Sequence, residues 1–287
     1  MKILVTGAKG FIGSHICERL NKNPYYVIPW DRDNGDLKVI TKFPLVDCVI
    51  HLAAMVTTSD YYTKAFDVLQ NNIIPTLNLL NFYRQQEHKP LFIYTGTPES
   101  YAGATDLYNY KIPTDENAPF VISDPKNLRW SYAGSKGLGE QAVIASGLDY
   151  IIVRPHNTYG PGQVGHFVRE FVERAKNKDY TVHGSDNTRS WLYIDDFCDA
   201  FIKLMNCKNA INETVNIGSA DEYPVIDLAK IILQKMNIDE QPIPLKGPKG
   251  SVSRRQADIS KLKRLTGWEQ KISLEKGLEL TVESLCK

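Results

Sequence analysis

The sequence predicts an α/β fold in which a doubly wound parallel sheet carries a second, smaller α/β lobe. Two observations lead to this prediction. Short runs rich in β-branched residues alternate with longer segments of helical period, which is typical of βαβ units rather than of a sandwich. The chain also has 287 residues. At about 150 residues per domain, that length corresponds to two domains or to one large domain with a cap.

Five strands and three helices are expected in the first half of the chain. The strands lie near residues 3–6, 26–31, 47–53, 91–94 and 149–153, and the helices near residues 11–21, 63–85 and 130–146. After Arg154 the rhythm changes, because several prolines and glycines interrupt the chain. Helical periods return near residues 166–177, 195–205, 224–236 and 273–285. We therefore divide the chain into residues 1–154 and residues 155–287.

Composition and charge exclude several classes of protein. The chain has 34 Lys and Arg against 33 Asp and Glu, so nothing indicates a nucleic-acid or anionic-membrane binder. Its longest apolar stretch, residues 45–56, contains Asp47 and His51 and is shorter than the about 20 residues of a membrane span. The five cysteines include no Cys-x-x-Cys pair. We expect reduced thiols in a cytoplasmic protein, and no bound metal.

A glycine turn links the first strand to the first helix. Gly7, Gly10 and Gly13 form the pattern Gly-x-x-Gly-x-x-Gly, which brings the backbone and the free N–H groups of a helix N-terminus close to a pyrophosphate. Asp31 ends the second strand about 20 residues later, where a carboxylate bonds the adenine ribose of NAD. The neighbouring Arg32 would accommodate NADP instead. These features predict a Rossmann-type, NAD(P)-binding portion over residues 1–154.

A tyrosine and a lysine open the helix after the fourth strand. Tyr132 and Lys136 lie four residues apart and so share one helix face. Tyrosine has an ordinary pKa of about 10 and acts as a base near neutrality only when its pKa falls by about 3 units. A nearby ammonium and a cationic nicotinamide would lower it, and Lys136 would also hold the nicotinamide ribose. Thr97, after the fourth strand, is our candidate for bonding the substrate hydroxyl.

With these residues the chain resembles the extended short-chain dehydrogenase/reductase family, which contains nucleotide-sugar epimerases, dehydratases, decarboxylases and reductases. The resemblance covers essentially the whole chain. Its segments are the glycine turn, residues 51–54, Asn71 and Asn72, Tyr132 with Lys136, and residues 154–161, 188–196, 255–258 and 265–268. The resemblance implies further cofactor contacts from Phe11, Ile12, Asp36, Leu37, Leu52, Ala53, Ala54 and Asn71. It also implies a homodimer formed through helices 63–85 and 130–146.

Three further residues resemble the family's contacts to a nucleotide diphosphate sugar: Asn157, Arg189 and Arg255. Guanidinium groups bind phosphate oxygens bidentately, so two arginines suit a pyrophosphate. Taken without the resemblance, Arg189 and Arg255 would be interpreted as surface salt-bridge partners.

The strand end reads Thr97-Pro98-Glu99, where the family's 4,6-dehydratases carry Thr-Asp-Glu. Proline has no proton to donate, so a 4,6-dehydratase is disfavoured. Glu99 is then either a catalytic base or a solvated loop residue.

The resemblance thus implies an NAD-dependent nucleotide-sugar epimerase that oxidises sugar carbon 4 to a 4-keto intermediate and returns the hydride to the other face. A 4-keto reductase that consumes NADPH remains an alternative. A UDP-glucuronate-type decarboxylase also remains, although it needs a cationic or hydroxyl partner for the substrate carboxylate. An NAD(P)-sensing binding module is disfavoured, because such a module would be expected to lack the Tyr132 and Lys136 pair.

Overall fold

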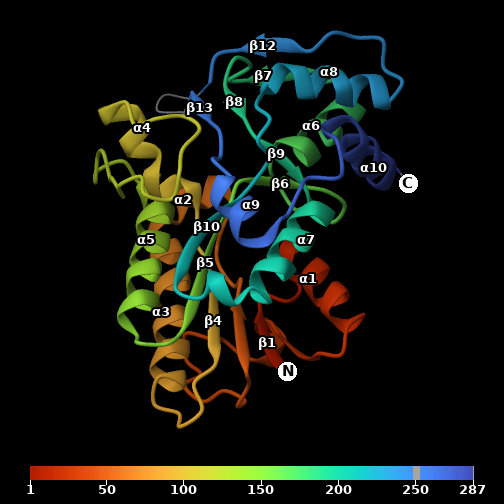
Figure 1. Ribbon diagram of the computed structural model, residues 1–287. Coiled ribbons are helices and arrows are strands. Elements are labelled where there is room, and N and C mark those ends of the chain that lie inside the picture. The colour runs from red at the N-terminus through yellow and green to blue at the C-terminus, as the bar shows by residue number, and fades with distance from the viewer. Residues whose placement is uncertain (248–252, 287) are drawn as a thin grey trace.

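A six-stranded parallel sheet forms the centre of the computed structural model, which describes residues 1–247 and 253–286. The strand order is β10-β5-β4-β3-β1-β2 (Figure 1). The strands are β1 (Lys2–Thr6), β2 (Tyr26–Trp30), β3 (Cys48–His51), β4 (Leu91–Thr95), β5 (Tyr150–Pro155) and β10 (Glu213–Ile217). All five predicted strands are present, and the predicted fold class is confirmed.

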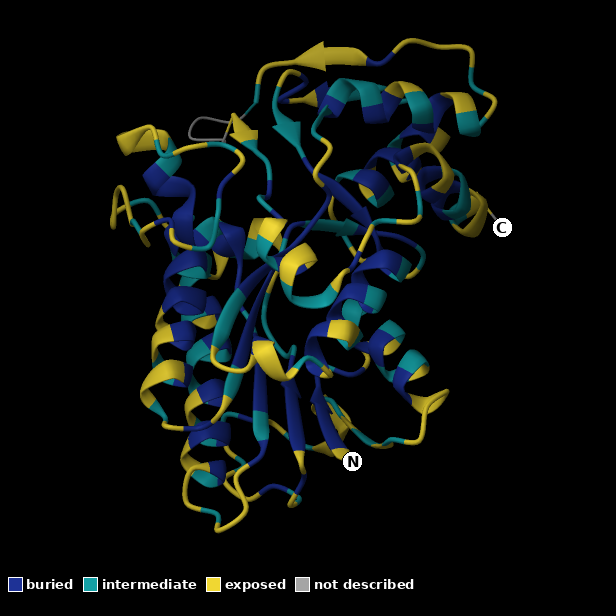
Figure 2. Cartoon of the chain, viewed as in Figure 1, coloured by how far each residue is buried: buried dark blue, intermediate teal, exposed yellow. Residues whose placement is uncertain are grey.

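Helices cover both faces of the sheet. Its central strands are therefore buried along almost their whole length. One face packs against α3 (Ala65–Tyr83) and α5 (Trp130–Ala145), and the other against α1 (Phe11–Asn21) and α7 (Ile194–Met205). Figure 2 shows the strands as a buried centre between helices whose outer faces are exposed. The helix predicted over residues 63–85 is α3, and a separate short helix, α2 (Thr58–Thr63), precedes it.

The sixth strand, β10, comes from the second half of the chain and pairs with β5 at the sheet edge. It is not among the predicted strands, because the alternation of strands and helices that located the other five is lost after Arg154. The division of the chain after residue 154 stays a prediction. In the structure, β10 and α7 from beyond that point lie with the large sheet.

Small sheets and three helices build the second lobe, in the upper part of Figure 1. Its strands are β6 (Asn157–Tyr159), β7 (Thr181–His183), β8 (Thr188–Arg189), β9 (Trp191–Tyr193), β11 (Tyr223–Pro224), β12 (Ile243–Leu245) and β13 (Arg254–Arg255). Its helices are α6 (Phe167–Lys176), α8 (Val225–Lys235) and α10 (Leu274–Cys286), whereas α9 (Ser260–Thr266) lies beside α7 and β10. Shorter elements are α4 (Ala102–Tyr108) and the 3-10 helices η1 (Arg32–Asn34), η2 (Pro98–Tyr101) and η3 (Lys208–Ala210).

The strand order creates a crevice between β1 and β3. From β1 the chain moves outward to β2 and then returns to the other side of β1 as β3, so the loops after β1 and β3 diverge at the carboxyl edge. Ligands of open α/β sheets bind at such a switch point. Where they leave their strands, the loops after β1 and β3 are still in close contact. Gly7 has φ +72°, and a Cβ on it would lie 2.7 Å from the Ala53 nitrogen. Only glycine fits that position.

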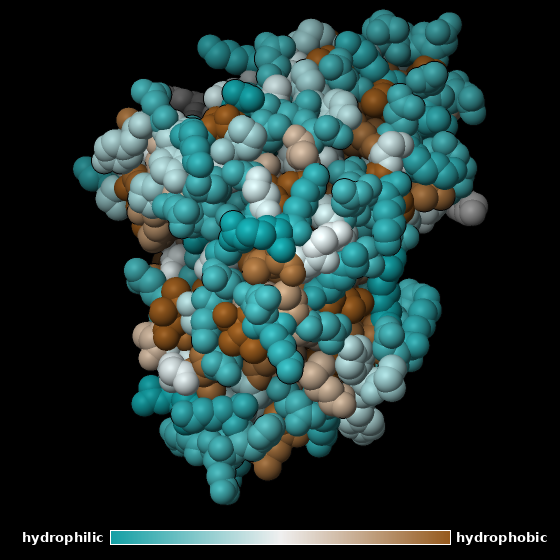
Figure 3. Space-filling model, viewed as in Figure 1, coloured by the Kyte–Doolittle hydropathy of each residue, from teal (hydrophilic) through white to brown (hydrophobic). Residues whose placement is uncertain are grey.

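The surface carries no extended apolar face in the view of Figure 3, where hydrophilic side chains dominate and hydrophobic ones form small patches. Within residues 1–247 and 253–286, no helix is long and apolar enough to cross a membrane.

Asn216, near the end of β10, ties the second half of the chain to the large sheet. Its side chain is fully buried. Its amide donates to the Thr114 carbonyl (3.1 Å) and to the Asp258 carbonyl (3.2 Å), and it accepts from the Tyr101 hydroxyl (3.3 Å). The Thr114 backbone in turn pairs with residues 256–258. One buried amide therefore fixes the segment that follows β13 beside the loop before α5.

We expect Asn216→Ala to lower the free energy of unfolding by about 2 to 4 kcal/mol, because it leaves two carbonyls and a hydroxyl buried without that partner. Urea unfolding followed by circular dichroism measures the change. Asn206→Ala, at the exposed end of α7, is the matched control. Equal losses in both variants would contradict the role of the Asn216 amide.

Candidate active site

A cleft of about 1470 Å³ runs along the carboxyl ends of the strands and beneath the second lobe. Every residue that the sequence assigns to the cofactor, to the chemistry or to the substrate lines it. The structure thus brings together residues that lie up to about 250 positions apart in the chain. The individual roles of these residues stay predictions.

At one end of the cleft the glycine turn meets the N-terminus of α1. Gly10 is the N-cap and no side chain caps the helix, so its first N–H groups face the cleft. A Cβ on Gly13 would collide with the Gly7 carbonyl, which explains the third glycine. Asp31 accepts from the backbone nitrogens of Lys9 and Arg32, each at 2.8 Å. Its carboxylate therefore holds the turn against the end of β2.

The loop after β3 forms the next part of the wall, with Leu52, Ala53 and Ala54. Asn72 fastens this loop to α3, because its side chain accepts from the Met55 nitrogen at 2.7 Å and donates to the Met55 carbonyl at 3.2 Å. Asn71 lines the cleft, and its amide donates to the Asp67 carbonyl of its own helix.

Phe11, Ile12, Asp36 and Leu37 complete the cofactor end of the cleft. Leu37 is 7% exposed, and the Asp36 carboxylate accepts from the Lys38 nitrogen at 2.9 Å. Both predicted residues therefore face the cleft from the short segment between β2 and β3.

Tyr132, in the first turn of α5, lines the cleft beside Thr97 from the end of β4. Burial raises the pKa of Tyr132 to about 12, and the nearby Thr97 hydroxyl opposes that effect. The lowered pKa expected from the sequence is therefore not a property of the protein alone. In this site burial outweighs the charges that the chain supplies.

Lys136 lies one turn further along α5 and is only 3% exposed. Its ammonium donates to the Thr95 carbonyl at 2.7 Å and lies 5.0 Å from the centre of the Tyr94 ring. Burial lowers the pKa of Lys136 to about 8, and Glu140 opposes this shift. Lys136 thus joins α5 to the end of β4.

Glu140 continues the same helix face and forms a buried ion pair with Arg154 of β5. The two contacts are 3.0 Å from Nε to Oε1 and 2.7 Å from Nη2 to Oε2. A Cβ on Gly96 would collide with the Glu140 carboxylate. The sequence analysis did not identify this pair, although the spacing of Glu140 from Lys136 places both on one face.

Glu99 of η2 lies between two arginines in the cleft wall. Its carboxylate accepts from Arg129 at 2.9 Å and from Arg255 at 2.7 Å. Burial favours the neutral acid, yet the arginines outweigh it and hold the pKa of Glu99 below its usual range. The interpretation of Glu99 as a solvated loop residue is wrong, because its side chain is only 20% exposed and is paired on both oxygens.

Arg189 and Arg255 are cleft residues rather than surface ion-pair partners. The Arg255 side chain is 11% exposed, and its Nη2 is buried without a hydrogen-bond partner among the described residues. Burial and the nearby Arg255 charge lower the pKa of Arg189 to about 9. Asn157 of β6 lines the same end of the cleft.

Arg129 and Tyr61 are two of the cleft residues that the sequence analysis did not predict. Arg129 precedes Tyr132 by three residues, a spacing that places both on one side of a helix start. Tyr61 of α2 stacks on the Tyr132 ring, with centroids 4.6 Å apart and planes at 7°. No local pattern links Tyr61 to Tyr132, because they lie on different helices.

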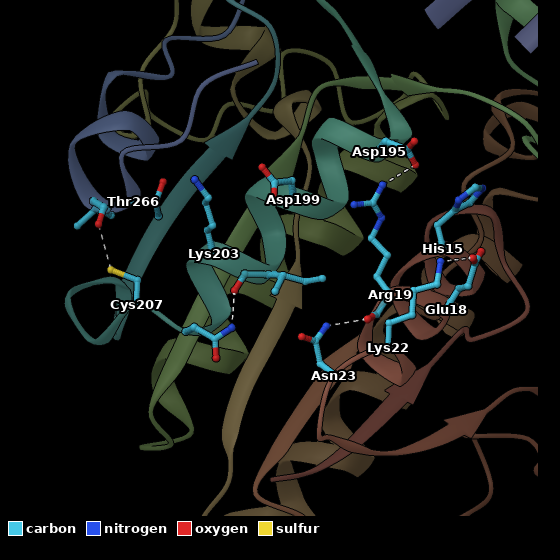
Figure 4. Close-up of a pocket in the computed structure, with 13 residues that line it drawn as sticks. His15, Glu18, Arg19, Lys22, Asn23, Asp195, Asp199, Lys203, Cys207 and Thr266 are labelled. Carbon is cyan, nitrogen blue, oxygen red and sulfur yellow. Dashed lines mark hydrogen bonds and ion pairs between the residues drawn. The ribbon is translucent and has the colours of Figure 1, made fainter. Parts of the chain in front are cut away.

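A second hollow of about 880 Å³ lies between α1, α7 and α9 (Figure 4). Arg19 and Asp195 form an ion pair of 2.7 Å across it. Its lining includes none of the predicted site residues. We therefore locate the candidate active site in the larger cleft.

Comparison with known proteins identifies the family. Residues 3–218 match the model of the "NAD dependent epimerase/dehydratase family". The chain belongs to this family. The predicted resemblance is confirmed, and the chain is an enzyme of a family whose cofactor is NAD.

Relatives in the epimerase/dehydratase family match over nearly the full chain. A putative UDP-glucose 4-epimerase of Methanocaldococcus jannaschii is 31% identical, covering 98% of this chain and 97% of its own length. A UDP-N-acetyl-alpha-D-glucosaminuronate decarboxylase of Bacillus cytotoxicus is 29% identical with the same coverage. The crystal structure of a UDP-glucose 4-epimerase from Thermotoga maritima with UDP-glucose superimposes with a TM-score of 0.88. It is 29% identical and covers 100% of this chain and 99% of that one.

The ion pairs of Glu99 predict a pH-dependent stability. Ionised Glu99 stabilises the fold above its ordinary pKa of 4.5, and this contribution is lost as the pH falls through the lower folded-state pKa. At neutral pH we expect Glu99→Gln to cost about 1 to 3 kcal/mol. Urea unfolding from about pH 6 to about pH 3 should show the gap between wild type and variant closing. A difference in unfolding free energy that stays constant with pH would contradict the role of the ionised Glu99 carboxylate. Glu240→Gln, at an exposed position, is the control.

Proposed function

We propose that this enzyme is an NAD-dependent nucleotide-sugar 4-epimerase that works through a ketone at sugar carbon 4. The observation that carries the proposal is the meeting of Tyr132, Thr97 and Lys136 at one point of a cleft large enough for a dinucleotide and a nucleotide sugar. The proposed substrate class is supported by relatives that are named as UDP-sugar epimerases or as a UDP-sugar decarboxylase.

The cofactor end of the cleft fits NAD. Gly7 and Gly13 let the turn pack directly against the Ala53 backbone and the start of α1, and the uncapped α1 N-terminus offers N–H groups to a pyrophosphate. Asp31 would bond the adenine ribose and repel a 2′-phosphate, which favours NAD over NADP. Bound NAD accepts a hydride from a sugar carbon and returns it.

The substrate end fits a diphosphate. Arg189 and Arg255 would bind it, with the unpartnered Nη2 of Arg255 as a ready donor, and Asn157 would add an amide contact. These two arginines and Arg129 outnumber the paired Glu99 in this part of the cleft, so an anionic ligand would be stabilised.

In the reaction, the ionised Tyr132 oxygen would take the proton of the sugar 4-hydroxyl as carbon 4 gives up its hydride. Thr97 would hold the same sugar oxygen, and the positive charge of Lys136 would favour the tyrosinate that accepts the proton. When the ketone presents its other face, Tyr132 returns the proton and the product is the 4-epimer.

Decarboxylation of a glycuronosyl nucleotide is a second candidate, and Arg129 favours it. A decarboxylase needs a cationic partner for the substrate carboxylate, which the sequence analysis could not locate. Arg129 supplies a guanidinium one turn from Tyr132 in the cleft wall. The same oxidation at carbon 4 would then produce a β-keto acid that loses carbon dioxide.

We also propose a cytoplasmic homodimer. Phe66 and Leu77 of α3 lie on one helix face and are 70% and 42% exposed, and Leu138 of α5 is 49% exposed. Such apolar side chains suit the helix-mediated dimer that the resemblance implies. Five free cysteines and an NAD-linked reaction fit the cytoplasm.

The deciding experiment incubates the protein in deuterated water with catalytic NAD and a panel of UDP-, dTDP-, GDP- and CDP-sugars, including glycuronosyl forms. We expect a new carbon 4 epimer without deuterium at carbon 4, observed by NMR and mass spectrometry. Release of carbon dioxide would establish the decarboxylase instead. Turnover that appears only with NADPH and a 4-keto sugar would contradict both and indicate a reductase.

Tyr132→Phe is the matched variant for that assay. We expect turnover to fall by a factor of about 1000 or more, while NAD binding measured by fluorescence stays unchanged, because only the acid–base hydroxyl is removed. Near-normal turnover would refute the assigned mechanism.

For the dimer, we expect light scattering to give twice the chain mass for the wild type and the chain mass for Leu77→Glu. A charge at a buried apolar contact disfavours association. Leu107→Glu, on the exposed part of α4, is the control. A dimer that survives the Leu77 change would place the interface elsewhere.

A further inference from the structure

The catalytic tyrosine candidate is covered on one face by a second tyrosine. The rings of Tyr61 and Tyr132 lie 4.6 Å apart and within 7° of parallel. Tyr61 comes from α2 and Tyr132 from α5, so the contact joins two helices across the wall of the cleft. Tyr61 is only 8% exposed. One face of the Tyr132 ring is therefore closed to water.

Tyr61 is itself held in place from both sides. Its hydroxyl donates to the Val56 carbonyl at 2.7 Å, and its carbonyl accepts from the Ser131 hydroxyl at 3.4 Å. Val56 follows Met55, which Asn72 fixes through two hydrogen bonds. The Tyr61 ring thus has a defined plane, set by the loop after β3 and by α3.

A ring with a fixed plane restrains the ring that packs on it. Two neighbours restrain Tyr132: Thr97 lies near its hydroxyl, and the stacked Tyr61 sets the plane of its ring. The rate of a reaction falls steeply when one of the reacting groups is displaced by about 1 Å from its reactive position. Tyr61 also keeps water away, and burial is the main cause of the raised Tyr132 pKa.

We propose that Tyr61 is a positioning residue that orients Tyr132 and keeps one face of its ring dry during proton transfer. The inference rests on the proposed acid–base role of Tyr132. The other groups that act on the Tyr132 hydroxyl are Thr97 before η2, Glu99 of η2 and Arg255 of β13, whereas Tyr61 packs on the ring itself.

The test compares variants that keep or remove the stacked ring. Tyr61→Phe keeps the ring and should retain most activity. Tyr61→Leu removes it and should lower kcat by about 10- to 100-fold, with substrate KM and NAD affinity nearly unchanged. The pH profile of kcat should shift to lower pH, because water on the exposed face of Tyr132 relieves its burial. Tyr61→Met is a second ring-free variant of closer volume, should the leucine variant fold poorly.

Tyr83 provides a matched control. It is a fully buried tyrosine whose hydroxyl donates to the Pro44 carbonyl at 2.9 Å and whose ring stacks on Phe43. Tyr83→Leu should lower the melting temperature as Tyr61→Leu does and leave the pH profile of kcat unshifted. If both leucine variants change kcat and its pH profile alike, the positioning role is refuted.

A direct titration separates this inference from the proposed function. Ultraviolet difference spectra of each background against its Tyr132→Phe partner report the ionisation of Tyr132 without any substrate. A lower Tyr132 pKa in Tyr61→Leu than in wild type supports the contact, and an unchanged pKa overturns it. Absence of turnover with every sugar in the wild type would refute the proposed reaction and leave this titration to decide the stacking contact.

Discussion

The ion pair between Glu140 and Arg154 is the interaction on which the arrangement of the site depends. It joins α5 to β5 with two hydrogen bonds in a buried setting, where loss of one partner costs about 3 to 5 kcal/mol. The same helix face carries Tyr132 and Lys136, so the pair sets how far these side chains extend beyond the end of β4. Gly96 has no side chain because the carboxylate occupies that space. Arg154 also lies over the Tyr101 ring and donates to the Glu116 carbonyl.

From this pair, buried polar contacts extend into the second lobe. Asn216 stands opposite Arg154 in the β10 and β5 register, and it holds the segment that follows Arg255. Arg255 then reaches Glu99 at the end of β4. The position of Arg255 relative to Tyr132 is thus set by contacts at the edge of the large sheet. A buried amide with every hydrogen-bonding group used has one favourable arrangement, and this specifies how the two halves of the chain meet.

The sequence predicts those parts of the fold and site that depend on local patterns. The glycine turn, the five strands and the spacing of Tyr132 and Lys136 are readable because each depends on neighbours within a few residues. β10, Tyr61 and the pairing of Glu99 are not. β10 lies where the alternation of strands and helices is lost, Tyr61 meets Tyr132 only after α2 and α5 pack, and Glu99 is charged because two distant arginines converge on it. Contacts between distant elements define these features, and one sequence contains no record of such contacts.

The ionisation of the site shows how the protein and its ligands divide the chemistry. In the protein alone, burial raises the pKa of Tyr132 to about 12 and lowers that of Lys136 to about 8. Both shifts disfavour charge, so the site does not stabilise a tyrosinate before ligands bind. A cationic ring beside Tyr132 would reverse this balance in the same dry surroundings, where its charge acts strongly. In the proposed reaction the chain would therefore contribute a dry site and fixed geometry, and the charge that favours the Tyr132 tyrosinate would come with the cofactor.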